Sequence, residues 1–192
     1  IFFSIIKWVV LATVIGTIVG TATSFFLKGL GWSIATASGW NNYYLLLPVA
    51  MFVSALLTKY LSPDSEGHGT EKVIESIHKR NGDLRARVVP VKIVTTTITA
   101  AFGGSIGKEG PAAQIGAALA SVFAKIFHFS PGDRKRLVIC GISAGFAAVF
   151  GTPIAGAIFG VEVLIVGSIM YEVLLPSFIA GMVSFQVASG LG

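Results

Sequence analysis

The sequence predicts an all-α integral membrane protein built from tilted and broken transmembrane helices. Of its 192 residues, 54% are hydrophobic and 12% are charged, whereas a soluble domain carries about 25% charged residues. The mean hydropathy is +0.81. Long apolar runs alternate with short polar stretches, and a glycine-rich break that contains a lysine and a glutamate lies between two such runs at 103–111.

The first apolar run, 1–30, is interrupted by only two lysines. About 20 residues cross the hydrocarbon of a bilayer, so this run predicts a tilted span. Within it, Gly16 and Gly20 have the spacing that favours close packing between helices, here against another helix of this chain. An uncharged connection, 31–42, then leads to a second predicted span over 43–61.

A polar section separates the second span from a third span predicted over 88–104. It holds most of the charges, and a second basic group, 134–136, is expected in a later loop. By the positive-inside rule both basic stretches face the cytoplasm. This topology accounts for the formal net charge of +5, so no nucleic-acid partner is expected.

Within the polar section, a stretch rich in glycine and serine precedes a short amphipathic run over 73–78. The glycine and threonine before Glu71 suit the start of a helix whose first amides are open. The plain interpretation is a solvated loop followed by a helix cap. His68 and His78 match no zinc spacing and no cysteine is near them, so no metal site is expected.

The glycine-rich break is followed directly by a fourth predicted span over 109–127. Proline in a first helical turn wastes no hydrogen bond, so Pro111 marks a helix that starts near Glu109. The break then connects two adjacent spans at membrane depth, where irregular backbone persists only inside protein or beside an aqueous cavity. The free first-turn amides and the positive end of the helix dipole, roughly half a charge, form an anion site there.

A stretch rich in glycine and alanine follows at 137–164. Thr152-Pro153 divides it into two pieces, each expected to be too short to cross a membrane alone. Broken helices of this kind are typical of transport proteins, while close-packed helices without a transport role stay an alternative. Glu162 is expected at an interface, and the last predicted span is 171–191.

Two motifs resemble the strongest signatures of the CLC chloride channel and transporter family. One is Gly-Lys-Glu-Gly-Pro at 107–111, and the other is the glycine- and alanine-rich run from Gly141 to Gly156. The spacing of the loop at 63–70 fits as well. The resemblance covers nearly the whole chain but only the first of that family's two inverted repeats. It implies that residues 1–192 are the N-terminal half of a CLC-like transmembrane domain, a fragment without the second repeat.

Position by position, the resemblance implies a gating role for Glu109, whose carboxylate competes with the anion and swings away when protonated. It also implies a set of anion-binding residues: His68, Gly69, Thr70, Gly107, Lys108 and Gly110. His68 stands where the family usually has a serine, and an imidazole N–H can still donate to chloride. The substitution leaves anion selectivity and pH dependence open.

Proton coupling is the second departure from the family pattern. Exchangers of the family commonly carry an inner, proton-accepting glutamate where Val163 stands, and valine cannot carry a proton. The resemblance therefore favours passive transport of chloride or similar small anions through a pore gated by Glu109. The alternative is a chloride/proton antiporter with another proton route, for which Glu162 is a poorly placed candidate.

No enzyme is expected. Glu109 follows Gly107-Lys108 where a phosphate-binding loop needs Ser or Thr, and neither His68 nor His78 has a partner suited to an intramembrane protease. A structural scaffold leaves Glu109 unexplained, because ionisable groups at membrane depth are usually functional. The resemblance implies chloride ions and a second copy in a homodimer as partners, beside membrane lipid, in the plasma (inner) membrane and with no cofactor.

Overall fold

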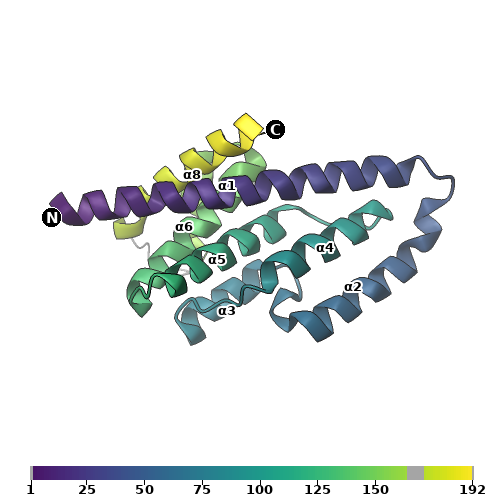
Figure 1. Cartoon of the computed structure of the whole chain (residues 1–192), viewed down its shortest axis with the longest axis horizontal. Helices are drawn as coiled ribbons and strands as arrows, with labels where there is room; N and C mark the ends of the chain where they lie inside the picture. Colours follow the sequence, from purple (N-terminus) through teal and green to yellow (C-terminus); the bar gives the residue numbers. More distant parts are fainter. Residues whose placement is uncertain (1, 164–170, 192) are drawn as a thin grey trace.

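The computed structural model describes residues 2–163 and 171–191, and the regular elements in these ranges are all helical. Figure 1 shows the longest helix, α1, lying across a group of shorter helices. Short 3₁₀ segments, η1 (Tyr43–Leu46) and η2 (Pro63–Ser65), precede α2 and α3. The α-helices are α1 (Phe2–Ser38), α2 (Leu47–Leu61), α3 (Thr70–Arg80), α4 (Val88–Ala101), α5 (Glu109–Ile126), α6 (Pro131–Phe150), α7 (Pro153–Glu162) and α8 (Tyr171–Leu191).

Most of the predicted segments are confirmed as helices. Phe3–Ser38, Tyr43–Leu61 and Tyr171–Leu191 are long and apolar enough to cross a membrane. The predicted division of the glycine-rich stretch is present, because α6 ends before the division and α7 begins at Pro153. Residues 1, 164 and 192, where predicted segments begin or end, lie outside the described ranges.

The first span is longer than the sequence predicted. α1 has 37 residues, or about 55 Å at 1.5 Å per residue, and it continues to Ser38 instead of ending at Leu30. The predicted connection over 31–42 is therefore wrong for most of its length. No proline interrupts this part of the sequence, and Gly29 and Gly31 each weaken a helix by only about 1 kcal/mol.

The basic group 134–136 lies in a helix and not in a loop. α6 has 20 residues and begins at Pro131, where the hydroxyl of Ser130 accepts a hydrogen bond from the Asp133 amide at 3.2 Å. Proline at the first helical position fits this start, because its nitrogen carries no hydrogen. Neither piece around Thr152 is among the helices of the described chain that are long and apolar enough to cross a membrane, since α6 begins with charged residues and α7 has 10 residues.

The centre of the fold is the seam between α5 and α6, where glycines let the two backbones touch. A Cβ atom at Gly116 would collide with the carbonyl oxygen of Gly141, and one at Gly141 would collide with that of Gly116. Gly145 lies equally close to the carbonyl oxygen of Ala112. Helices approach this closely only where no side chain stands between them.

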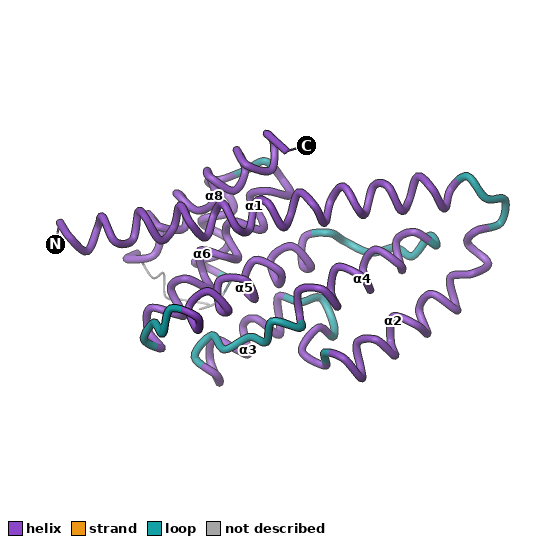
Figure 2. The backbone as a smooth tube through the Cα atoms, in the orientation of Figure 1, coloured by secondary structure: helices purple, strands orange, loops and turns teal. Residues whose placement is uncertain are grey.

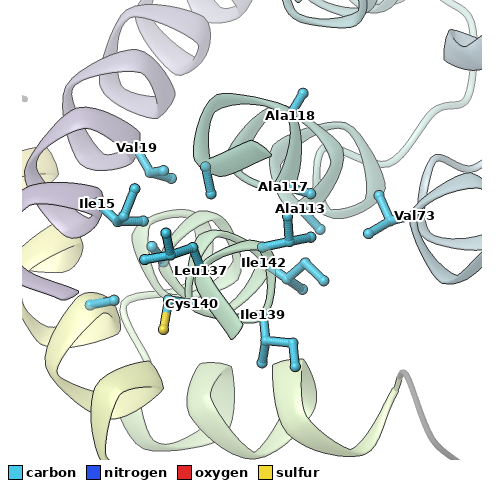
Figure 3. Close-up of a cluster of buried hydrophobic side chains, with 14 of the residues drawn as sticks. Ile15, Val19, Val73, Ala113, Ala117, Ala118, Leu137, Ile139, Cys140 and Ile142 are labelled. Atoms are coloured by element: carbon cyan, nitrogen blue, oxygen red, sulfur yellow. The ribbon is translucent and has the colours of Figure 1, made fainter. Parts of the chain in front are cut away.

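Apolar side chains enclose this seam. Figure 3 shows Ile15 and Val19 of α1 on one side and Val73 of α3 on the other, with α5 and α6 between them. Leu137 and Ile142 of α6 are also fully buried in the cluster. The seam is thus held from both sides, which fixes the position of α5.

Helix α1 packs on α8 through the glycine pair noted in the sequence. A Cβ atom at Gly16 would lie 2.6 Å from the carbonyl oxygen of Ala180, and one at Gly20 would lie 2.6 Å from that of Ser184. Ser184 itself donates a hydrogen bond to the carbonyl of Ala144 in α6 at 2.9 Å. The predicted packing of this motif within the chain is confirmed.

The N-terminus, the end of α3 and the turn between α5 and α6 lie toward the same end of the molecule (Figure 1, left). Lys7 Nζ pairs with Asp133 Oδ2 at 2.8 Å, and Arg136 Nη2 pairs with Glu172 Oε2 at 2.6 Å. These ion pairs tie α1 and α8 to the start of α6. This is the end that the positive-inside rule predicts to face the cytoplasm.

Replacing Gly141 with leucine is expected to destabilise the protein by ~3 kcal/mol or more, because the new side chain has to separate two backbones. Thermal unfolding of the purified protein in detergent measures the loss. Gly29→Leu is the matched control, since a Cβ atom at Gly29 meets nothing within 4 Å. An equal loss of stability in both variants would contradict the tight seam.

Candidate anion site

A cavity of about 1020 Å³ lies beside the two irregular segments that the sequence singled out. Residues 63–68 without Asp64 line one part of it, and residues 105–111 without Lys108 line another. Helices α2 and α4 supply most of the remaining wall, and nearly all of these side chains carry hydroxyl or ammonium groups: Ser54, Thr58, Lys59, Lys92, Thr95, Thr96 and Thr99. Hydroxyl and ammonium groups therefore line this cavity although the helices that build it are apolar.

The break at 103–111 places the start of α5 inside the molecule. Gly103 has a φ of 85°, a conformation that costs glycine no steric energy. Gly104 packs against Thr99, whose carbonyl oxygen lies 2.8 Å from where a Cβ atom would stand. Figure 2 shows the chain then running back from the tip of α4 to the start of α5. Glu109 is the first residue of that helix, as predicted.

The start of α3 meets the start of α5 through glycine. The carbonyl oxygen of His68 lies directly against Gly110. Gly69, with a φ of 94°, would place a Cβ atom 2.9 Å from the Gly110 carbonyl and 2.8 Å from Gln114 Oε1. The two helix starts that the sequence predicted, at Thr70 and Glu109, are thus brought together by direct backbone contact.

Both helix starts present free amides. The first hydrogen bond within α5 runs from the Ala112 amide to the Lys108 carbonyl, and in α3 it runs from the Val73 amide to the Gly69 carbonyl. The amides before these donors have no helical acceptor, and no side chain caps either helix. Such amides, together with the positive ends of two helix dipoles, stabilise an anion.

Two buried polar side chains hold the loop before α3 in place. Lys92 is only 6% exposed, and its ammonium group donates to the carbonyl oxygens of Ser65 at 3.1 Å and Gly67 at 2.7 Å. Gln114, fully buried in α5, donates from Nε2 to the Asp64 carbonyl at 2.7 Å. Three carbonyls of this loop, those of residues 64, 65 and 67, are therefore hydrogen-bonded to side chains of α4 and α5.

The side chain of Asp64 ties the same loop to the basic end of the molecule. Its Oδ1 lies 3.2 Å from Arg80 Nη2, and its Oδ2 lies 3.7 Å from Arg85 Nε. The Asp64 carboxylate is thus paired with one arginine of α3 and with another from the connection after α3. Asp64 does not line the cavity, and the acidic residues that do are Glu66 and Glu109.

Not every residue of the predicted anion-binding set lines the cavity. His68, Gly107 and Gly110 do so together with Glu109. The carboxylate oxygen Oε2 of Glu109 lies directly over Gly107, so this side chain folds back across the start of its own helix. The remaining members of the predicted set are outside the lining: Gly69, Thr70 and Lys108.

The two positions considered for proton coupling lie away from this cavity. Glu162 is exposed at the end of α7, and Val163 is half-buried against the hydrophobic core. Neither residue lines the cavity. The geometry of the cavity therefore gives no support to the predicted role of either residue, Val163 as the position that lacks a proton acceptor and Glu162 as its weak substitute.

Sequence reasoning missed several polar residues of the site. Lys92 and Gln114 were detectable in principle, because each is a polar residue inside an apolar helix. Their partners were not detectable, since these are backbone carbonyls of a loop 25 to 50 residues away in sequence. The hydroxyl groups of Thr95 and Thr99 gave no signal because threonine is common in apolar spans.

Comparison with known proteins decides the family. The family model described as voltage gated chloride channel matches residues 49–192. The chain belongs to this family. Its members are channels and transporters and not enzymes, and the resemblance found at 107–111 and 141–156 is confirmed.

Similar members of the family include both channels and antiporters. A chloride/fluoride channel protein of Pseudomonas syringae pv. tomato is 37% identical over an aligned length of 192 positions, and the match covers 98% of this chain and 41% of that protein. A CLC-type fluoride/proton antiporter of known crystal structure is 30% identical, with a TM-score of 0.90 over 100% of this chain and 48% of that one.

A more distant structure, that of a slow cyanobacterial chloride/proton antiporter, shares the fold at 22% identity. Its TM-score is 0.79, and the match covers 96% of this chain and 47% of that one. The chain therefore spans less than half the length of each of these proteins. These matches establish a CLC-type helical membrane fold that belongs to an anion-transporting family.

Replacing Lys92 with methionine is expected to weaken anion binding roughly tenfold or more, because two loop carbonyls lose a charged donor and the loop loosens. Isothermal titration of fluoride or chloride into the complete protein in detergent measures the change. Lys59→Met is the control, since it removes a charge from the same cavity without loosening the loop. Equal weakening in both variants would show that Lys92 acts through its charge alone.

Proposed function

We propose that this chain forms half of a membrane transporter that exchanges a small halide, fluoride or chloride, for protons. The other half is a second repeat of the CLC type. The names of the two relatives above 25% identity both include fluoride, and one of them is a proton antiporter. The alternative is a passive channel, which the valine at position 163 favours.

The observation that carries the proposal is the position of the Glu109 carboxylate. It lies over Gly107 at the end of α5 that has free amides. Glu109 lines the cavity there together with His68, whose carbonyl oxygen contacts Gly110. An anion that binds to these amides has to displace the carboxylate. Protonation removes the negative charge and weakens its hold on the helix end, so proton binding favours anion binding.

The cavity suits an anion that gives up its water. Amides at two helix ends and the hydroxyl groups along α2 and α4 replace water as donors, while the full positive charges of Lys59 and Lys92 stand on the wall. His68 adds an imidazole donor that the usual serine would not supply. Fluoride accepts strong hydrogen bonds, and we therefore include it beside chloride as a substrate.

The assembly and the membrane are further proposals. Ile154 of α7 and Leu175 of α8 are 66% and 54% exposed, which suits contact with lipid or with a second copy of the protein. We expect a homodimer with one pathway per subunit in the plasma membrane. Light scattering of the complete protein in detergent gives its mass, and a monomeric mass would contradict the dimer.

The complete protein in liposomes is expected to move protons against their own gradient when a fluoride or chloride gradient drives it. An anion electrode and a pH electrode record both fluxes together. Coupling requires a fixed ratio of protons to anions across a range of gradients. Anion flux without any coupled proton movement would instead establish the passive channel.

Replacing Glu109 with glutamine is expected to give anion flux that no longer responds to pH, because a neutral amide cannot switch between a bound carboxylate and a free acid. Flux assays between about pH 5 and pH 8 measure the response. Glu71→Gln is the control, since Glu71 also lies in a first helical turn but outside the cavity lining. An unchanged pH response in the Glu109 variant would count against the gate.

A further inference from the structure

Glu66 is a second carboxylate in the cavity that contains Glu109. Both residues line its wall, and His68 lines it as well. In the described parts of the chain, the Glu66 side chain is exposed and no ion pair or hydrogen bond engages its carboxylate. It therefore differs from Asp64, two positions earlier, which is held by Arg80 and Arg85.

The backbone of Glu66 is held in place although its side chain is free. The carbonyls on either side of it, those of Ser65 and Gly67, both accept hydrogen bonds from Lys92. The Asp64 carbonyl is bound by Gln114 of α5. A rigid backbone with a free carboxylate in a cavity that has room for many water molecules suits a proton carrier, because the acid must reach solvent and return to one place.

The position of Glu66 also suits a route from the basic end of the molecule. Asp64, two residues before Glu66, pairs with Arg80 and Arg85 of the basic end, whereas Glu109 lies at the start of α5. The carbonyl of His68 touches Gly110, the residue after Glu109. The charged or titratable groups that line this space are Lys59, Glu66, His68, Lys92 and Glu109.

We propose that Glu66 is the cytoplasmic proton acceptor of the exchanger. This inference depends on the proposed proton exchange. The Glu66 carboxylate takes a proton from water at the cytoplasmic end, and the neutral acid passes it through water or the His68 imidazole to the Glu109 carboxylate. Glu66 is then a carboxylate again, and Glu109 is neutral and leaves its helix end to the anion. Because this path does not pass through Val163, a valine there does not interrupt it.

The test is Glu66→Gln in the complete protein, reconstituted in liposomes with a fluoride or chloride gradient. The ratio of protons to anions is expected to fall at least ~10-fold. Anion binding, measured by calorimetry in detergent, is expected to be no weaker than that of the parent protein, because the substitution removes a negative charge from the cavity wall. Glu66→Asp keeps a carboxylate and is expected to restore much of the proton movement. Glu75→Gln, on α3 and outside the cavity lining, is the control and is expected to leave both quantities unchanged.

Several results would overturn the inference. If Glu66→Gln keeps the parent ratio, or if Glu162→Gln abolishes coupling while Glu66→Gln does not, the proton takes another route. If Glu66→Gln loses anion binding and Glu66→Asp does not restore coupling, the residue is only structural. If the parent protein itself moves no protons, the proposed exchange is wrong and this inference falls with it. If the parent protein couples protons to anions and Glu66→Gln does so equally well, only this inference is wrong.

Discussion

The site depends on one backbone contact, in which His68 and Gly69 lie against the first turn of α5. The carbonyl of His68 lies on Gly110, and Gly69 lies on the Gly110 carbonyl. Any Cβ atom at these glycines would push the two helix starts apart and enlarge the gap between their free amides. The left-handed backbone at Gly69 adds a second reason for glycine, since other residues adopt it at a cost.

The way in which Lys92 is held has an electrostatic consequence. Its ammonium group is bound by neutral carbonyls and not by a carboxylate, so the positive charge is stabilised without being cancelled. Gln114 fastens the same loop without adding any charge. The candidate site thus combines one buried ammonium group with partial charges from helix ends, a combination that suits the weak and reversible binding of an anion that we propose.

Much of the fold could be read from the sequence, because its signals are local. The hydrophobic runs, the proline after Glu109 and the Thr152-Pro153 division each mark a helix through their own chemistry. The continuation of α1 to Ser38 was missed because glycines such as Gly29 and Gly31 weaken a helix without ending it. The partners of Lys92 and Gln114 were missed because contacts between a side chain and a distant carbonyl leave no pattern in sequence.

The glycine seam between α5 and α6 limits how the site can move. Gly116 and Gly141 lie backbone on backbone, and a contact of this kind cannot be compressed or slid without a large steric cost. Helix α5 is therefore held rigidly, and the gate that we propose at Glu109 opens by rotation of one side chain. Opening of this proposed gate then leaves the packing between α5 and α6 unchanged.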